Sequence, residues 1–400
     1  MKPTILFMVP AEYDALVAKG VDHMILERDE EGFFKRCVTV HPLTQRTQTI
    51  DINETHVIHE IGFDLILGSH RHKLLRYLQV PLHFFRILKI CGRLVREEYV
   101  DLIRATDPYW MGFFALLVAR KRGLPFCVSI HSDYDKRFEL DGKLGAPTIL
   151  GSRKLAKRLE RFVLSRADLV MPIRESLGKR AICDGARSEL VRIIPHGIDL
   201  RPFSEEASYD IYQMFGIDRH KKILSFVGRL SNENYVGDLL EMARQLSLQR
   251  EDFILVFAGG GNEEDRLRHT VNNEPQLGKT VRMLGFQPRE VCIDLRRASE
   301  VNLCLMAGFS LIEACASGRP VLSYDVEWHY ELVHNGETGF LIKEHNIKQL
   351  VDAVSYLLDH PDEAAEMGNN ARDLALAKHD IRITLEIKRD CYRELLNDRR

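Results

Sequence analysis

Short apolar runs alternate with longer amphipathic segments along most of the chain, and this pattern constrains the fold more than any other feature. Apolar runs of this length are typical of strands buried on both faces of a sheet. Strand, helix and strand repeated in this way predict parallel sheets with right-handed crossovers, and hence an α/β protein. We expect strands at 4–9, 36–41, 126–131, 168–173, 190–196, 222–228, 253–261, 281–285, 301–306, 320–325 and 339–342.

The chain has 400 residues, which is long for one hydrophobic core. The pattern breaks at "PHGIDLRPFSEEASYD" (195–210), which is rich in Pro, Gly and acids. We therefore predict two Rossmann-like, doubly wound parallel-sheet domains facing a cleft, at 1–197 and 198–379. A last helix at about 380–400 could pack back on the first domain. In such sheets ligands bind beyond the carboxyl ends of the strands, so we expect the functional residues in the loops that follow strands.

The composition argues against several classes of protein. The formal net charge is -2, so charge predicts no nucleic-acid partner. The 8 cysteines form no CxxC pair, which predicts reduced, buried thiols rather than disulfides or a zinc site. The first apolar run is too short for a signal peptide, and no stretch reaches the roughly 18 apolar residues of a membrane span. These features predict a cytoplasmic protein.

Two loops of the second half contain residues suited to a phosphate. Gly228 frees the backbone after the strand at 222–228, and Arg229 follows it. An arginine fork donates paired hydrogen bonds to phosphate, although a surface arginine at a sheet edge would look the same. The glycines at 259–261 permit a tight turn, which is weak evidence by itself.

The stretch "MAGFSLIEACASGRPV" (306–321) reads as a strand end, a turn and a short helix that Gly318 ends. Ser310 and Glu313 have the spacing of a capping box, so Glu313 could simply cap the helix. The alternative is a helix N-terminus that holds a phosphate, with Glu313 on the adjacent ribose.

Taken together, "PHGID" (195–199), "FVGRL" (226–230), "LIEACASGRPV" (311–321) and "ELVHNGETGFLI" (331–342) resemble the motifs of the retaining glycosyltransferases of family 4. The resemblance covers most of 190–375. It implies the GT-B fold and transfer of a hexose from a nucleotide-diphosphate sugar to an acceptor hydroxyl with retention, in glycan, polysaccharide or glycolipid biosynthesis. It also implies that neither a metal nor another cofactor is needed.

The resemblance implies roles for particular residues. Arg229 would contact the donor diphosphate as a catalytic residue beside Gly228, and Glu313 would hold the ribose. Glu331 would lie behind the donor loop, although a surface acid is the simpler interpretation. The backbone near the sugar and phosphate would come from Gly308, Phe309, Ser310 and Leu311.

The chain departs from the family pattern at two places. The family usually has a lysine five or six residues after the arginine, where this chain has Asn234 and Tyr235. The family often has a second glutamate eight positions before the first, where this chain has Leu305. The alternative to an enzyme is therefore a degenerate nucleotide-sugar-binding or scaffold protein with little or no transferase activity.

The first half resembles the family less closely. His131 ends the strand expected at 126–131 and should face the cleft. It matches a family histidine that contacts the donor sugar, although a loop histidine bonded to backbone would look alike. Asp133, Asp135 and Glu12 are candidates for the acceptor side, where the partner would be a sugar or a lipid-linked glycan. Solvation of a loop, or a helix start in the case of Glu12, is the alternative.

The segment 71–96 is basic and amphipathic. Arg71, Lys73, Arg76, Arg86 and further cations interleave with Leu, Phe and Tyr. Such a helix can lie on an anionic membrane, which would place the protein peripherally on the inner face of the membrane. A helix that packs on the core and turns a basic face to solvent is the alternative.

Overall fold

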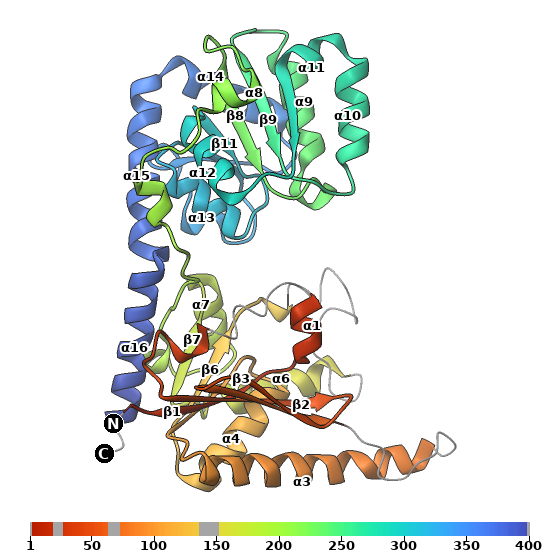
Figure 1. Ribbon diagram of the computed structural model, residues 1–400, viewed down its shortest axis with the longest axis vertical. Coiled ribbons are helices and arrows are strands. Elements are labelled where there is room, and N and C mark those ends of the chain that lie inside the picture. Colours follow the sequence, from red (N-terminus) through yellow and green to blue (C-terminus); the bar gives the residue numbers. More distant parts are fainter. Residues whose placement is uncertain (1, 19–26, 63–72, 136–151, 398–400) are drawn as a thin grey trace. The chain divides into compact units, whose positions relative to one another are not determined.

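The computed structural model describes residues 2–18, 27–62, 73–135 and 152–397. The chain divides into two compact units (Figure 1). Unit 1 comprises Met1–Pro195 with Leu385–Arg400, and unit 2 comprises His196–Thr384, so the division falls inside the last helix. Each unit contains its own parallel sheet with helices on both faces.

Unit 1 is built on a sheet that has seven strands within the described ranges, in the order β3-β4-β2-β1-β5-β6-β7. All neighbours pair in parallel except β3, which pairs antiparallel with β4 at the edge. The strands are β1 (Thr4–Met8), β2 (Arg36–Thr44), β3 (Gln48–Asn53), β4 (His56–Gly62), β5 (Leu102–Ala105), β6 (Phe126–Ile130) and β7 (Leu169–Pro172). The helices are α1 (Tyr13–Ala18), α3 (Lys73–Glu97), α4 (Trp110–Arg122), α6 (Arg153–Leu164), α7 (Glu175–Cys183) and α16 (Ile381–Asn397).

The two faces of the unit-1 sheet are covered by different helices. Side chains of α3, α4, α6 and α7 pack on one face, which includes Leu6 and Met8 of β1. The other face includes Ile5 and Phe7, and Tyr392 of α16 packs there without exposure to solvent. Alternate residues of β1 thus enter two cores, which explains why its sequence is apolar throughout.

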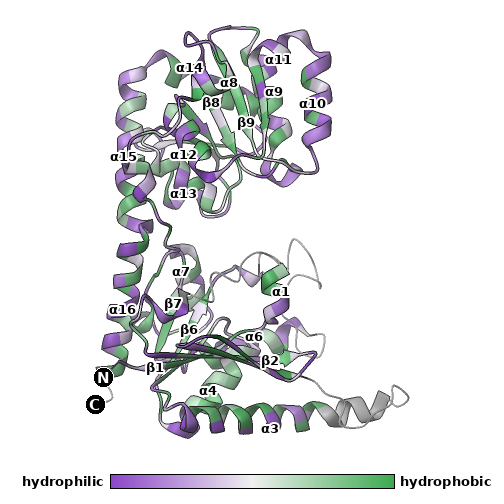
Figure 2. Cartoon of the chain, viewed as in Figure 1, coloured by the Kyte–Doolittle hydropathy of each residue, from purple (hydrophilic) through white to green (hydrophobic). Residues whose placement is uncertain are grey.

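Unit 2 is built on a sheet that has six parallel strands in the described residues, in the order β10-β9-β8-β11-β12-β13. Its strands are β8 (Lys222–Val227), β9 (Phe253–Ala258), β10 (Val281–Gly285), β11 (Val301–Leu303), β12 (Val321–Tyr324) and β13 (Gly339–Ile342). Its helices are α8 (Ile211–Phe215), α9 (Val236–Leu246), α10 (Glu264–Asn273), α11 (Pro275–Thr280), α12 (Arg289–Ala298), α13 (Phe309–Ala316), α14 (Ile347–Asp359) and α15 (Pro361–His379). Figure 2 shows hydrophobic strands and helices that alternate between hydrophilic and hydrophobic residues, as the sequence pattern predicted.

The doubly wound α/β architecture confirms the predicted fold class, but one expected strand is wrong. Residues 190–196 form no strand, and only Val191 makes an isolated bridge to Val170 of β7. The backbone N–H groups of Arg192 and Ile194 do donate to β7, over 2.9 Å each. Pro172 has no N–H to return the bond, so a regular ladder cannot form.

The expectation of buried thiols is correct for most cysteines. Six of the eight are buried, Cys292 is half-buried and Cys183 is exposed. Burial raises the pKa of Cys91 and Cys127 to about 12, which keeps these thiols protonated and unreactive.

Candidate functional site

The carboxyl ends of β8 and β11 and the start of α13 surround a cavity of about 340 Å³ in unit 2. This volume lies within the range of small-molecule sites, about 300–1,000 Å³. The lining consists of Phe226, Val227, Gly228, Arg229, Ser231, Glu233, Asn234, Cys304, Met306, Ala307, Gly308, Phe309 and Ser310. Most of the donor residues expected from sequence therefore lie around one space, but Leu311 and Glu313 are not among its lining residues.

The loop after β8 brings Arg229 to the rim of the cavity with an exposed side chain. Asn234 braces this loop, because its Nδ2 donates to the backbone O of Arg229 over 2.7 Å. The glycines after β9 support it from behind. A Cβ on Gly259 would lie 1.9 Å from the backbone O of Gly228, and one on Gly261 would lie 2.2 Å from that of Leu230. These glycines thus allow two loops to touch rather than a ligand to approach.

The N-terminus of α13 opens on the same cavity. Gly308 is the N-cap and no side chain caps the helix. Within the described part of the chain, the N–H groups of Phe309 and Ser310 have no hydrogen-bond acceptor. A Cβ on Gly308 would meet nothing within 4 Å, so this end of the helix leaves free space. The Leu311 N–H donates to the Gly308 O over 3.2 Å and its side chain is buried in the core, which separates it from the cavity.

The capping-box interpretation of Ser310 and Glu313 is wrong. Ser310 is the second residue of α13, and its Oγ donates to the backbone O of Val227 over 2.6 Å. Glu313 Oε1 instead accepts from Nε of Arg289 over 3.1 Å, and this carboxylate is largely shielded. Arg289 also donates to the backbone O of Asp199 over 2.8 Å. Glu313 is therefore a paired carboxylate one turn from the cavity.

The two departures from the family pattern have clear structural settings. Leu305 is fully buried in the unit-2 core, so the loop after β11 presents no carboxylate at that position. Tyr235 adopts a left-handed conformation with φ of 56° at the start of α9, and its ring meets Tyr324 edge-on at 5.0 Å. Neither position supplies a cation to the cavity.

Two buried residues near the cavity escaped the sequence interpretation. His329 has no solvent exposure, and its Nε2 lies 3.3 Å from N and 3.1 Å from O of Ala307. Ser323 holds the other ring nitrogen at 2.5 Å and donates to the Cys304 O, so the pair fixes the loop after β11. Arg296 of α12 is buried behind Ser310. Nothing in the sequence around His329 or Arg296 indicates that these side chains are buried beside the cavity.

Three of the four unit-1 candidates lie on the loop after β6. His131 directly follows the last residue of that strand and is half-buried. Asp133 Oδ1 accepts from the Asp135 N–H over 3.0 Å. On a different loop, Glu12 Oε1 accepts from the Gln45 N–H over 2.5 Å. The structure therefore brings His131, Asp133 and Asp135 together but does not bring Glu12 into contact with them.

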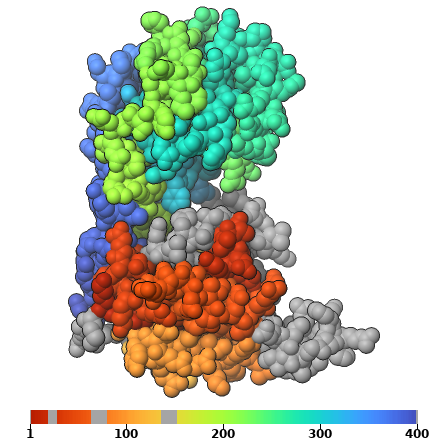
Figure 3. Space-filling model, in the orientation of Figure 1, coloured from red at the N-terminus to blue at the C-terminus, as the bar shows by residue number. Residues whose placement is uncertain are grey.

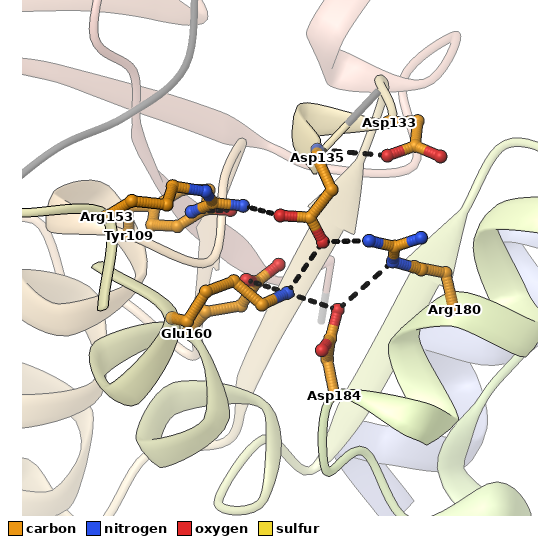
Figure 4. A network of polar contacts seen from close by, with 8 residues as sticks. Tyr109, Asp133, Asp135, Arg153, Glu160, Arg180 and Asp184 are labelled. Atoms are coloured by element: carbon orange, nitrogen blue, oxygen red, sulfur yellow. Dashed lines mark hydrogen bonds and ion pairs between the residues drawn. The ribbon is translucent and has the colours of Figure 1, made fainter. Parts of the chain in front are cut away.

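Asp135 is the centre of an ion-pair network (Figure 4). Arg153 and Arg180 reach its two oxygens from either side, and Lys157 Nζ lies 3.0 Å from Oδ2. Lys157 continues to Asp184 at 2.5 Å. Burial works to raise the pKa of Asp135, but the hydrogen bonds from Lys157, Arg180 and Arg153 outweigh it and hold the pKa at about 2. This geometry gives Asp135 a structural partner for each of its oxygens.

The basic segment is the helix α3, which lies at the surface of unit 1 (Figure 3, orange). Arg71 lies outside the described residues, as do the side chains of Lys73 and Arg76. Ile87, Cys91 and Leu94 pack into the core, whereas Val80, Leu82 and Phe85 are exposed, Phe85 by 67%. Among the described helices, none is both long and apolar enough to cross a membrane. The described residues also contain no group of three His, Cys, Asp or Glu side chains suited to a metal.

Comparisons with known proteins agree with this architecture. Residues 14–197 match the family model "Glycosyl transferase 4-like domain" and residues 210–374 match "Glycosyl transferases group 1". The alpha-D-kanosaminyltransferase of Streptomyces kanamyceticus is 25% identical over 71% of this chain and 74% of its own length. The D-inositol 3-phosphate glycosyltransferase of Nocardiopsis dassonvillei is 26% identical over 70% and 67%. The crystal structure of Anabaena HepE in complex with UDP superposes with a TM-score of 0.65 at 15% identity, over 98% of this chain and 100% of that one.

The two sheets and these similarities define a GT-B glycosyltransferase. The chain belongs to glycosyltransferase family 4, and its class of activity is hexosyl transfer.

Proposed function

We propose that the protein moves a hexose from a nucleoside-diphosphate sugar to an acceptor hydroxyl with retention of configuration, in the synthesis of a glycan, polysaccharide or glycolipid. The supporting observation is the unit-2 cavity, where an exposed arginine and a helix N-terminus with two free N–H groups share one space. Both features favour a diphosphate. The UDP complex of HepE makes UDP the first donor nucleotide to test.

Departure of the diphosphate is the step that these groups would assist. The bond from the sugar to the diphosphate oxygen breaks as the acceptor oxygen bonds to the same carbon from the same face. Negative charge develops on the leaving oxygen, which takes up the proton of the acceptor hydroxyl. Arg229 and the N–H groups of Phe309 and Ser310 would already point at that oxygen before the reaction begins. Donors arranged in advance in this way stabilise the charge that develops in the transition state. No enzyme nucleophile and no metal are required in this scheme.

The remaining candidates take supporting roles. Glu313 would accept hydrogen bonds from the ribose, and its contact with Arg289 would orient the carboxylate for that role. His131 would contact the donor sugar from unit 1. Asp133 and Glu12 would face the acceptor, a sugar or a lipid-linked glycan. The ion pairs of Asp135 leave it better suited to shaping the His131 loop than to binding the acceptor itself.

Donor hydrolysis and transfer assays test the proposal. Purified protein is offered UDP-, GDP- and ADP-sugars with a membrane extract as acceptor source, and turnover is compared between wild type, Arg229→Ala and Glu313→Ala. Each substitution should lower kcat/KM at least about tenfold, equivalent to about 1.4 kcal/mol. Arg266→Ala, an exposed arginine of α10 paired with Glu263, is the matched control and should leave turnover unchanged. Binding of a donor without turnover of any would favour the degenerate alternative instead.

We also propose that α3 brings the protein to an anionic membrane surface. Val80, Leu82 and Phe85 are exposed, and Lys89 and Arg93 are exposed further along the same helix. An apolar group flanked by cations fits the boundary between headgroups and acyl chains. Phe85→Glu should abolish sedimentation with vesicles containing phosphatidylglycerol, while Tyr99→Glu, another exposed aromatic beyond the helix, should not. Equal sedimentation of both variants would contradict the proposal.

A further inference from the structure

Arg296 is an arginine that the fold buries without a carboxylate. Only 1% of it is exposed, and it is the largest of the fully buried side chains of the described residues. None of the ion pairs between described residues includes it, and its Nε has no hydrogen-bond partner there. An uncompensated buried charge is strongly unfavourable, so its retention calls for an explanation.

The position of Arg296 relative to the cavity supplies one. Its guanidinium donates to Ser310 Oγ over 2.6 Å and to the backbone O of Val227 over 3.3 Å, and it lies 4.0 Å from Cys304 Sγ. Val227, Cys304 and Ser310 all line the cavity. The guanidinium of Arg296 therefore lies directly behind residues that line the cavity, between the carboxyl ends of the paired strands β8 and β11.

The shielding from water makes this charge effective at a distance. A cation held in low dielectric interacts with an anion across several ångströms far more strongly than the same pair would in bulk water. Ser310 links Arg296 to the N-terminus of α13 by hydrogen bonds. Its Oγ accepts from Arg296 and donates to Val227, which fixes the first turn of α13 and the direction of its free N–H groups.

We infer that Arg296 is a positioning residue for the nucleoside diphosphate, and that it supplies from behind the cavity wall the positive charge absent at Asn234 and Tyr235. This inference rests on the proposed function, because it presumes that the cavity holds a nucleoside diphosphate. The diphosphate would supply the negative charge that Arg296 lacks among the described residues.

The experiment separates charge from structure by comparing ligands with and without phosphate. Calorimetric titrations of the full chain with UDP, GDP and ADP first identify the nucleotide that binds most tightly. That nucleoside diphosphate and its parent nucleoside are then titrated into wild type, Arg296→Met and Arg296→Lys. Arg297→Met is the matched control, because Arg297 is the next residue of α12 and already lies 3.5 Å from Asp294.

The inference predicts a specific pattern. Arg296→Met should weaken the nucleoside diphosphate at least tenfold and change the nucleoside less than twofold. Arg296→Lys should recover most of the lost affinity, and Arg297→Met should bind like wild type. Because Met removes an uncompensated charge, the Tm of Arg296→Met should equal or exceed that of wild type.

Three results would overturn it. Unchanged nucleoside diphosphate binding by Arg296→Met would show that the charge does not act on the ligand, and would leave the proposed function intact. Equal weakening of nucleoside and nucleoside diphosphate binding, or unfolding of both Arg296→Met and Arg296→Lys, would show that the side chain serves the fold alone. Failure of wild type to bind any nucleoside diphosphate would overturn the proposed function together with this inference.

Discussion

Replacement of Asp135 by Asn is the most informative perturbation of unit 1, because Asp135 was a candidate for the acceptor side and is now seen within an ion-pair network. The pKa of this carboxyl is about 2 against an ordinary value of 3.8, and the side chain is only 17% exposed. The depressed pKa corresponds to about 2 kcal/mol of stability. That free energy already includes the attraction of Arg153, Lys157 and Arg180 for the carboxylate, so we expect a total loss of about 2 kcal/mol.

The assay can report on unit 1 alone. The chain has two tryptophans, Trp110 in α4 and Trp328 in unit 2. In a Trp328→Phe background, urea unfolding followed by tryptophan fluorescence reports the environment of α4. The matched control is Asp390→Asn, whose partner Arg393 is exposed, and it should cost less than about 0.5 kcal/mol.

The pH dependence provides a second criterion. The native state holds Asp135 ionised more firmly than the unfolded state does, so its contribution is complete above pH 4 and disappears as pH falls towards 2. The difference between wild type and Asp135→Asn should therefore shrink over that window. A loss below about 0.5 kcal/mol, or normal stability combined with a raised KM for acceptor, would refute the structural role and restore the acceptor role.

Three further predictions follow from the site and the core. Gly308→Ala should leave Tm unchanged but weaken nucleotide binding, because the added Cβ meets no protein atom and occupies the open end of α13; thermal shift with and without UDP measures both effects. Burial lowers the pKa of His41 to about 4 from 6.5, so its contribution of about 3 kcal/mol is present above pH 6.5 and lost as pH falls towards 4. His41→Gln should make the free energy of unfolding in urea depend less on pH over that range. An unchanged dependence on pH would show that His41 is not responsible for the loss. Ser323→Ala should loosen the loop that His329 holds and lower nucleotide affinity several-fold. An affinity equal to that of wild type, measured by calorimetry, would show that this loop does not contribute to nucleotide binding.

The sequence predicted the strand order of unit 2 because its strands are mostly apolar and are separated by helical patterns. It did not predict β5, which is only four residues long, nor β3 and β4, because polar residues occupy them. His56 and Glu60 of β4 are buried, and they form hydrogen bonds with Thr39 and His41 of β2. Such pairing is invisible until the strands are adjacent, since each residue alone reads as exposed.

The same limit applies to the candidate site. Gly228, Arg229, Gly308, Phe309 and Ser310 were predictable because strand ends and a helix start place them by local rules. Arg296 was not, since the end of an amphipathic helix is an ordinary place for a solvent-facing arginine. Its burial depends on Ser310 and Val227 from two other elements. Local patterns position the backbone of the site, whereas tertiary packing decides which charges act on it.

A crystal structure of the protein with UDP or a UDP-sugar tests the central claim most directly. We expect a nucleotide in the unit-2 cavity, with its diphosphate in hydrogen-bond reach of the Arg229 guanidinium and of the N–H groups of Phe309 and Ser310. A nucleotide bound elsewhere, or one in the cavity whose phosphates point away from the start of α13, would contradict it.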